Sequence, residues 1–120
     1  MIYQKTETIQ DFQNRIIELE KYANDDGISV STNSKNEFWQ FIYNSDFKFK
    51  KDALFLTDNC NLRAVWSDSN NHLGLEFLGN STIHFVIFTD GYSTVKSGVD
   101  SQNNIVGIIK LYGLESLCAF

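Results

Sequence analysis

The chain has 120 residues, a formal net charge of −5, 42 % hydrophobic residues and no proline. This length suits a single domain over residues 1–120 with one core, and the apolar content excludes a disordered chain. The negative charge is the wrong sign for a general nucleic-acid binder. The N-terminus lacks the apolar stretch of an export signal, and no apolar run is long enough to span a membrane. We therefore expect a cytoplasmic protein whose partner is neither a membrane nor a nucleic acid.

The cysteines and histidines do not form a metal-binding pattern. Cys60 and Cys118 are far apart, and no Cys-x-x-Cys motif is present. In a chain without an export signal we expect reduced, unpaired thiols. Two histidines and two distant cysteines lack zinc-ligand spacing, and no glycine-rich phosphate loop is found. The sequence therefore predicts neither a cofactor nor a metal.

An amphipathic helix is predicted in the N-terminal region. Apolar residues between Ile9 and Ala23 recur at alternating spacings of three and four, which places them on one face of a helix. Thr8 is the predicted N-cap, and Gly27 is predicted to end the helix.

A second helix is predicted to begin after Ser34, which would form a capping box with Glu37. The segment EFWQFIYN then carries an aromatic stripe. Such a stripe is more often part of a hydrophobic core than of a cofactor site, so we expect these side chains to be buried.

From residue 53 the apolar spacing becomes alternating, which predicts strands. Four are expected, ALFLT, LRAVW, HLGLEFL and TIHFVIF, separated by loops rich in Asn, Asp, Gly and Ser. Loops this short permit only antiparallel neighbours. GYSTVKSG is predicted to be a flexible loop, followed by a helix containing residues 105–112. The predicted fold class is α+β: two N-terminal helices, a four-stranded antiparallel meander and a C-terminal helix.

The segment DNCN joins the first two strands. A two-residue type I′ turn at Asn59 and Cys60 is predicted, which requires a positive φ at both residues. Cysteine should pay about 1 kcal/mol for that conformation. A nucleophilic Cys60 would need a nearby base or cation, which a turn at the edge of the sheet does not supply. Cys60 is therefore interpreted as a tolerated strain rather than as a reactive group.

Loop lengths and alternation also predict the register, because a shift of one residue turns every side chain to the other face. Arg63 is predicted to face Glu76, and Glu76 to face His84. The predicted core face comprises Phe55, Leu62, Ala64, Trp66, Leu73, Leu75, Phe77, Ile83, Phe85 and Ile87. The predicted opposite face places Leu54, Leu56, Val65, Gly74, Leu78, Val86 and Phe88 around the Arg63–Glu76–His84 row. A face this apolar usually meets a helix, a second copy of the chain or a partner.

The row of charged residues has three interpretations. Cross-strand ion pairs are common and contribute at most ~1 kcal/mol. The row could instead contribute to partner binding. A third interpretation is RNA transesterification, with Glu76 as the base, His84 as the acid and Arg63 on the phosphate, as in guanyl-specific ribonucleases. Those enzymes carry the residues in the order Glu, Arg, His, and no base-stacking loop is evident in this chain. His72 is predicted to be a solvated turn residue.

The string DNCNLRAVW, followed by HLGLEFLG and VIF, resembles a family of small bacterial proteins that carry a DNGNLRAVW-type hairpin. The resemblance covers about residues 50–90 closely and the flanking helices loosely. It implies genes associated with mobile elements or toxin–antitoxin-like operons, and no assigned activity. This chain has Cys60 where the family has Gly, and Glu76 where the family usually has Gln. A general base at position 76 is therefore not a family requirement.

These observations favour a non-enzymatic protein-binding module, such as an antitoxin, an immunity protein or a phage-defence inhibitor, that acts through an exposed sheet face. Its expected partner is a protein, for example a basic toxin or effector. The predicted binding residues are Arg63, Val65, Glu76, His84 and Phe88. The alternatives are a small ribonuclease that uses the Arg-Glu-His row, and a homo-oligomer that buries the second sheet face.

Overall fold

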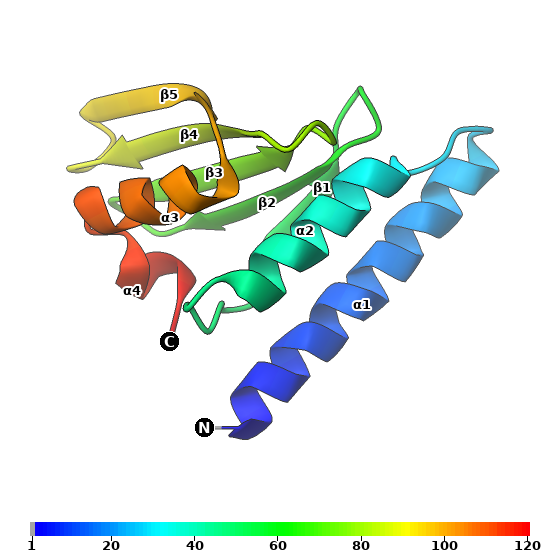
Figure 1. Cartoon of the computed structure of the whole chain (residues 1–120), viewed down its shortest axis with the longest axis horizontal. Coiled ribbons are helices and arrows are strands. Elements are labelled where there is room, and N and C mark those ends of the chain that lie inside the picture. The colour runs from blue at the N-terminus through cyan, green and yellow to red at the C-terminus, as the bar shows by residue number, and fades with distance from the viewer. Residues whose placement is uncertain (1) are drawn as a thin grey trace.

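The computed structural model describes residues 2–120, with side chains described from residue 8 onward. The elements are α1 (Ile2–Asp25), α2 (Thr32–Asn44), β1 (Ala53–Leu56), β2 (Leu62–Ser67), β3 (His72–Phe77), β4 (Ile83–Thr89), β5 (Thr94–Asp100), α3 (Gln102–Leu111) and α4 (Glu115–Cys118). The strands form one sheet in the order β1-β2-β3-β4-β5, and each neighbouring pair is antiparallel (Figure 1). The α+β class, the two N-terminal helices and the antiparallel meander are confirmed. The strand number is five rather than four.

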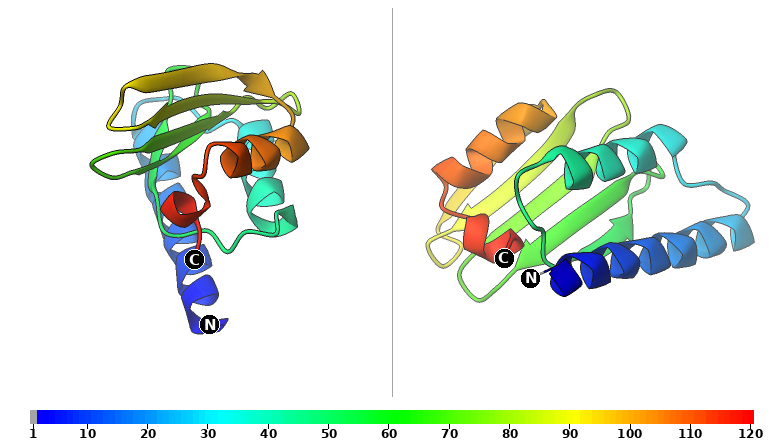
Figure 2. Two further views of the ribbon diagram at one scale, coloured as in Figure 1. Left: turned by 90° about the vertical axis from the view of Figure 1, so that its left-hand side faces the viewer. Right: turned by 60° about the horizontal axis from the view of Figure 1, so that its bottom comes forward.

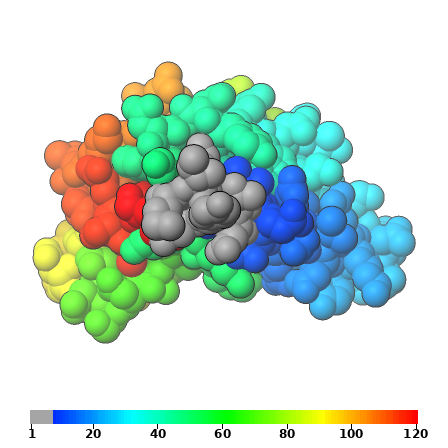
Figure 3. Space-filling model, turned by 90° about the horizontal axis from the view of Figure 1, so that it is seen from below, coloured from blue at the N-terminus to red at the C-terminus, as the bar shows by residue number. Residues whose placement is uncertain are grey.

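The helices lie together on one side of the sheet (Figure 2, left). Seen from below, α1 lies at one end of the molecule and α3 and α4 at the other, with α2 between them (Figure 3). None of the helices in residues 2–120 is both long and apolar enough to cross a membrane.

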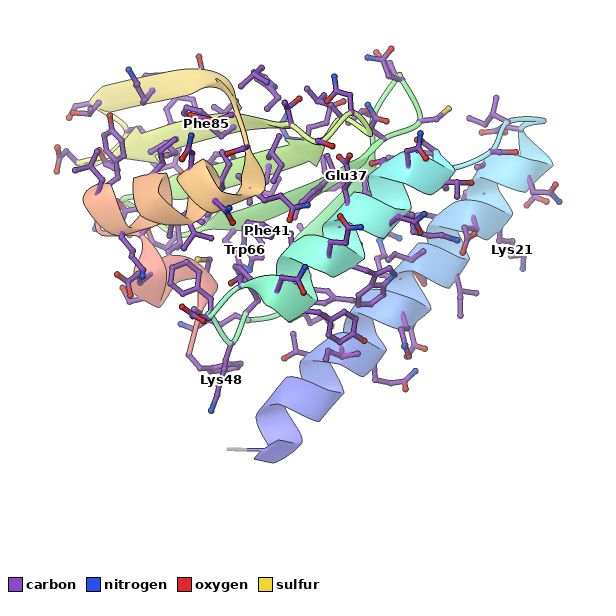
Figure 4. The ribbon with its side chains drawn as sticks, viewed as in Figure 1. Lys21, Glu37, Phe41, Lys48, Trp66 and Phe85 are labelled. Carbon is purple, nitrogen blue, oxygen red and sulfur yellow. The ribbon has the colours of Figure 1, made fainter. Side chains whose placement is uncertain are left out.

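The core fills the space between the helices and the sheet. The apolar faces predicted for α1 and α2 are confirmed, because Phe12 and Phe38 are 2 % and 0 % exposed. Phe41 and Trp66 come from α2 and β2 and lie between the two layers (Figure 4). The other buried core residues on the strands are Leu54, Leu62, Ala64, Leu73, Leu75, Phe77, Ile83, Phe85 and Ile87.

Strand β5 occupies the segment that was predicted to be a flexible loop. It pairs with β4 along its whole length, from Thr89 opposite Thr94 to Ile83 opposite Asp100. Most of its side chains are exposed, so the segment lacks the apolar alternation by which strands are recognised. Backbone pairing therefore holds this edge strand in place, and the Phe85 ring packs over Gly98.

Two predicted helix caps are wrong. Thr8 lies inside α1, which begins at Ile2. The N-cap of α2 is Ser31, whose hydroxyl accepts a hydrogen bond from the Ser34 amide at 3.2 Å. Ser34 is instead buried in the first turn of α2, where its hydroxyl accepts the Leu62 amide hydrogen at 2.8 Å. That bond ties α2 to β2.

Glu37 likewise has a tertiary role rather than a capping one. Its carboxylate accepts hydrogen bonds from the Gly79 amide at 3.0 Å and the Ser81 amide at 2.6 Å (Figure 4). Both amides belong to the β3–β4 loop, in which Gly79 and Ser81 have positive φ values of 81° and 72°. The carboxylate therefore holds the loop against α2.

The β1–β2 hairpin has a three-residue loop, not the predicted two-residue turn. The Thr57 amide donates to the Asn61 carbonyl at 2.8 Å, and the Cys60 amide donates to the Thr57 carbonyl at 2.9 Å. Cys60 has a positive φ of 65°, whereas Asn59 does not. This pattern is a type I turn followed by one left-handed residue, a position that favours glycine.

The longer loop reverses the predicted faces of β1. Leu54 pairs with Ala64 and is 2 % exposed, whereas Phe55 pairs with Arg63 and is 47 % exposed. Phe55 was predicted to lie in the core and Leu54 on the opposite face, and both assignments are wrong. One additional loop residue shifts the pairing by one position and turns every side chain of the strand over.

Replacing Cys60 by glycine is expected to stabilise the fold by about 1 kcal/mol, because glycine adopts a positive φ without steric cost. The free energy of unfolding in urea would measure this gain. The matched control is Asn59→Gly, which places glycine beside Cys60 at a residue with a negative φ and should not stabilise. A loss of stability in Cys60→Gly would mean that the thiol makes a contribution larger than the strain.

Candidate functional site

The predicted row across the sheet is confirmed in register. Arg63 pairs with Glu76, and Glu76 pairs with His84. The row extends to Phe55 on β1 and Val99 on β5. All five residues lie on the sheet face opposite the helices, which we call the outer face. Its other members, by register, are Ala53, Val65, Ser67, His72, Gly74, Val86, Phe88, Val95 and Ser97.

The Glu76 carboxylate accepts hydrogen bonds from two residues that were not predicted to contact it. Its Oε2 atom accepts hydrogen bonds from Thr57 Oγ1 and from Asn61 Nδ2, both at 3.1 Å. Among the described side chains, the ion pairs are Arg15–Glu18 and Lys35–Glu20, so Glu76 forms none with Arg63. The carboxylate instead anchors the β1–β2 loop.

The Arg63 side chain turns along the sheet toward Gly74 on β3. A β-carbon built on Gly74 would lie 2.8 Å from Arg63 Nη2 and 3.4 Å from Arg63 Nε. The same point lies 3.3 Å from His72 Nε2. The guanidinium and the imidazole therefore converge over one glycine, whose missing side chain makes room for them. Nothing in the described chain forms a hydrogen bond or an ion pair with Arg63.

His72 is not the solvated turn residue that was predicted. It is the first residue of β3, is half-buried, and packs edge-on against Phe88 with ring centroids 5.4 Å apart. Burial lowers the pKa of His72, and the charge of Arg63 lowers it further. The alternation of HLGLEFL places residues 72, 74 and 76 on one face, so the sequence contained the signal that locates His72.

The surroundings of Arg63 and His72 are largely apolar. Val65 and Val86 flank Gly74 in the register, and Phe88 is stacked on Tyr92 at 5.4 Å. The Tyr92 hydroxyl donates to the Asp68 carbonyl at 3.1 Å, which holds the ring in place. The predicted binding residues Arg63, Val65, Glu76, His84 and Phe88 thus share the outer face. None of the helices described in residues 2–120 covers it (Figure 2).

A second unusual group lies just before β1, the edge strand beside α1. Both carboxylate oxygens of Asp52 are buried without a hydrogen-bond partner among the described residues. Burial raises the pKa of Asp52 to about 7. Asp52 borders a cavity of about 320 Å³ between α1 and β1, where Arg15 Nε donates to the Leu54 carbonyl at 3.0 Å. Because this burial depends on how α1 packs, local sequence gave no signal for it.

Metal-binding and disulfide chemistry are not seen in the described part of the chain. It contains no group of three or more His, Cys, Asp or Glu side chains arranged to hold a metal ion. Cys60 and Cys118 are both free thiols, and burial raises the pKa of Cys118 to about 12. Cys118 is therefore a buried, unreactive side chain at neutral pH.

Comparison with protein-family models gives no match, and searches of curated proteins and of solved structures give none either. The outer face is therefore the feature from which a function can be inferred.

Proposed function

We propose that this chain is a non-enzymatic protein-binding module that docks a partner protein on the outer face. The observation that carries the proposal is an uncovered sheet face on which apolar side chains surround a few charged ones. Val95 and Val99 are 59 % and 56 % exposed, and Phe55 is 47 % exposed. Val65, Val86 and Phe88, which are half-buried, lie on the strands between them, and exposed apolar surface on an uncovered sheet face is typical of interaction sites.

The biological role that fits best is that of an antitoxin, an immunity protein or a phage-defence inhibitor in the cytoplasm. The resemblance of DNCNLRAVW to a mobile-element-associated family supports this role. The net charge of −5 supports a basic toxin or effector as the partner, since it would assist the encounter between the two proteins.

The arrangement gives the ribonuclease alternative little support. In that mechanism Arg63 would hold a phosphate between Glu76 and His84, yet its guanidinium turns away toward Gly74. The Glu76 carboxylate already accepts hydrogen bonds from Thr57 and Asn61, which hold it at the β1–β2 loop rather than beside a phosphate bound by Arg63.

The proposal predicts that an acidic substitution on the outer face disrupts a stoichiometric complex. Val99→Asp should lower recovery of the co-purifying partner at least tenfold, because an unpaired carboxylate would be desolvated in the interface. The measurement is affinity purification of the tagged chain from its native cells, with quantification of the protein that is retained in equimolar amount.

The matched control is Ile17→Asp, which makes the same kind of change on α1, where Ile17 is 64 % exposed. It should retain the partner. Equal recovery with wild type and both variants would contradict docking on the outer face. Sedimentation of the purified chain tests self-association: a wild-type dimer that Val99→Asp dissociates would make the partner a second copy.

A further inference from the structure

We infer that Arg63 is the anchor for a carboxylate group of the docked protein, an Asp or Glu side chain set among apolar residues. This inference rests on the proposed function, because it identifies the chemistry of the partner at the same face. It is carried by the Arg63–Gly74–His72 arrangement, which we call the anchor site.

Arg63 is available to a ligand because Glu76, the carboxylate opposite it in the register, is held by other residues. In register it faces Glu76, the residue that would ordinarily pair with it. Thr57 and Asn61 hold that carboxylate at the β1–β2 loop instead, each at 3.1 Å. The guanidinium, with five donor N–H groups, therefore has no carboxylate among the described side chains.

The geometry of the anchor site suits a planar anion. The guanidinium lies over Gly74, with Nη2 at 2.8 Å and Nε at 3.4 Å from the missing β-carbon. An edge of the guanidinium that presents two parallel N–H groups matches the two oxygens of a carboxylate. Gly74 is a buried strand residue whose φ is not positive, so its backbone conformation does not require glycine, whereas the space taken by the guanidinium does.

The apolar frame strengthens such a bond. Val65, Val86 and Phe88 surround the anchor site, and a docked protein would exclude water from it. A charge-assisted pair gains strength when it is removed from water and both partners are satisfied. An acidic residue flanked by apolar side chains therefore complements the outer face in both charge and polarity.

His72 provides a reporter for the bound anion. Its Nε2 lies 3.3 Å from the same point above Gly74, and burial, followed by the positive charge of Arg63, lowers the pKa of its imidazole. A carboxylate on Arg63 would neutralise that charge and favour the imidazolium. Binding should then raise the pKa of His72, a response that a purely apolar contact would not produce.

The test uses random 12-residue peptides displayed on phage and selected against the folded full chain. Enriched peptides should contain Asp or Glu beside apolar residues. Changing that acid to its amide should weaken binding to wild type at least tenfold. In Arg63→Ala the acid and the amide peptides should bind alike, which isolates the pairwise interaction. The His72 pKa, followed by NMR, should rise on addition of the acidic peptide.

Gly74→Ala provides a positioning control. The added methyl group meets the flexible end of Arg63, so the fold should remain intact while the guanidinium is displaced and the affinity for the acidic peptide falls. Arg63→Lys should restore the affinity only in part, because an ammonium cannot form the two parallel bonds.

The outcomes separate the two proposals. Peptides whose binding is weakened by Val99→Asp, but not by changing their own Asp or Glu to the amide, would overturn the carboxylate anchor and leave outer-face docking intact. Failure to select any peptide sensitive to Val99→Asp would count against both. Displacement of the acidic peptide by inorganic phosphate, and not by acetate at equal ionic strength, would assign the anchor site to phosphate and overturn the carboxylate.

Discussion

The wild-type chain is expected to lose stability as the pH rises from 5 to 8, and the Asp52→Asn substitution is expected to abolish this loss. Burial raises the pKa of Asp52 from 3.8 to about 7 in the folded state. Between those values the folded chain holds a proton that the unfolded chain releases, so the free energy of unfolding falls with increasing pH. The fall should amount to about 3 kcal/mol between pH 5 and pH 8 and should end above the folded pKa.

Urea unfolding of wild type and Asp52→Asn at several pH values measures this difference. The lowered pKa of His72 makes an opposite contribution in both proteins, so comparison of the two slopes isolates Asp52. The control Asp25→Asn changes an exposed carboxylate at the end of α1 and should leave the wild-type slope unchanged. Parallel slopes for wild type and Asp52→Asn would mean that the Asp52 carboxyl is ionised in the folded protein at little cost.

Phe38→Ala is expected to cost about 3–5 kcal/mol, a large part of the stability of a domain this size. Phe38 is fully buried and forms edge-to-face contacts with Phe12 of α1 at 5.3 Å and with Phe77 of β3 at 5.4 Å. It therefore joins both N-terminal helices to the sheet. Its removal would leave a cavity whose walls belong to three different elements.

The same unfolding measurement tests this substitution. Tyr43→Ala is the matched control, because it removes an aromatic ring from the same helix that is 54 % exposed and stacks on Trp39. That loss should stay near 1 kcal/mol. Similar costs for the two variants would show that the helix layer is not held through Phe38.

The sequence was sufficient for the central part of the fold because its strands have one buried and one open face. Alternation in β2, β3 and β4 predicted that Arg63, Glu76 and His84 lie in one row, and the register confirms it. The same reasoning was wrong for β1, because the DNCN loop has one more residue than a type I′ turn. Strand β5 was missed because an exposed edge strand shows no periodicity.

The chemistry of the site was less accessible to sequence reasoning. Register shows which residues are neighbours, but it does not show which way a long side chain turns. Arg63 turns toward Gly74 and away from Glu76, since Gly74 leaves space and Thr57 and Asn61 occupy the carboxylate. These competing contacts come from a loop and a neighbouring strand, so they emerge only when the strands are assembled.

Hydroxyl-radical footprinting of the complex with the captured partner tests the central claim most directly, because it reports side-chain accessibility residue by residue. Docking on the outer face predicts that Phe55, Phe88 and Tyr92 become protected. Exposed side chains on the helices, Ile17 and Leu111, should keep the reactivity of the free chain. Protection of the two helix residues with unchanged reactivity of Phe55, Phe88 and Tyr92 would contradict the account.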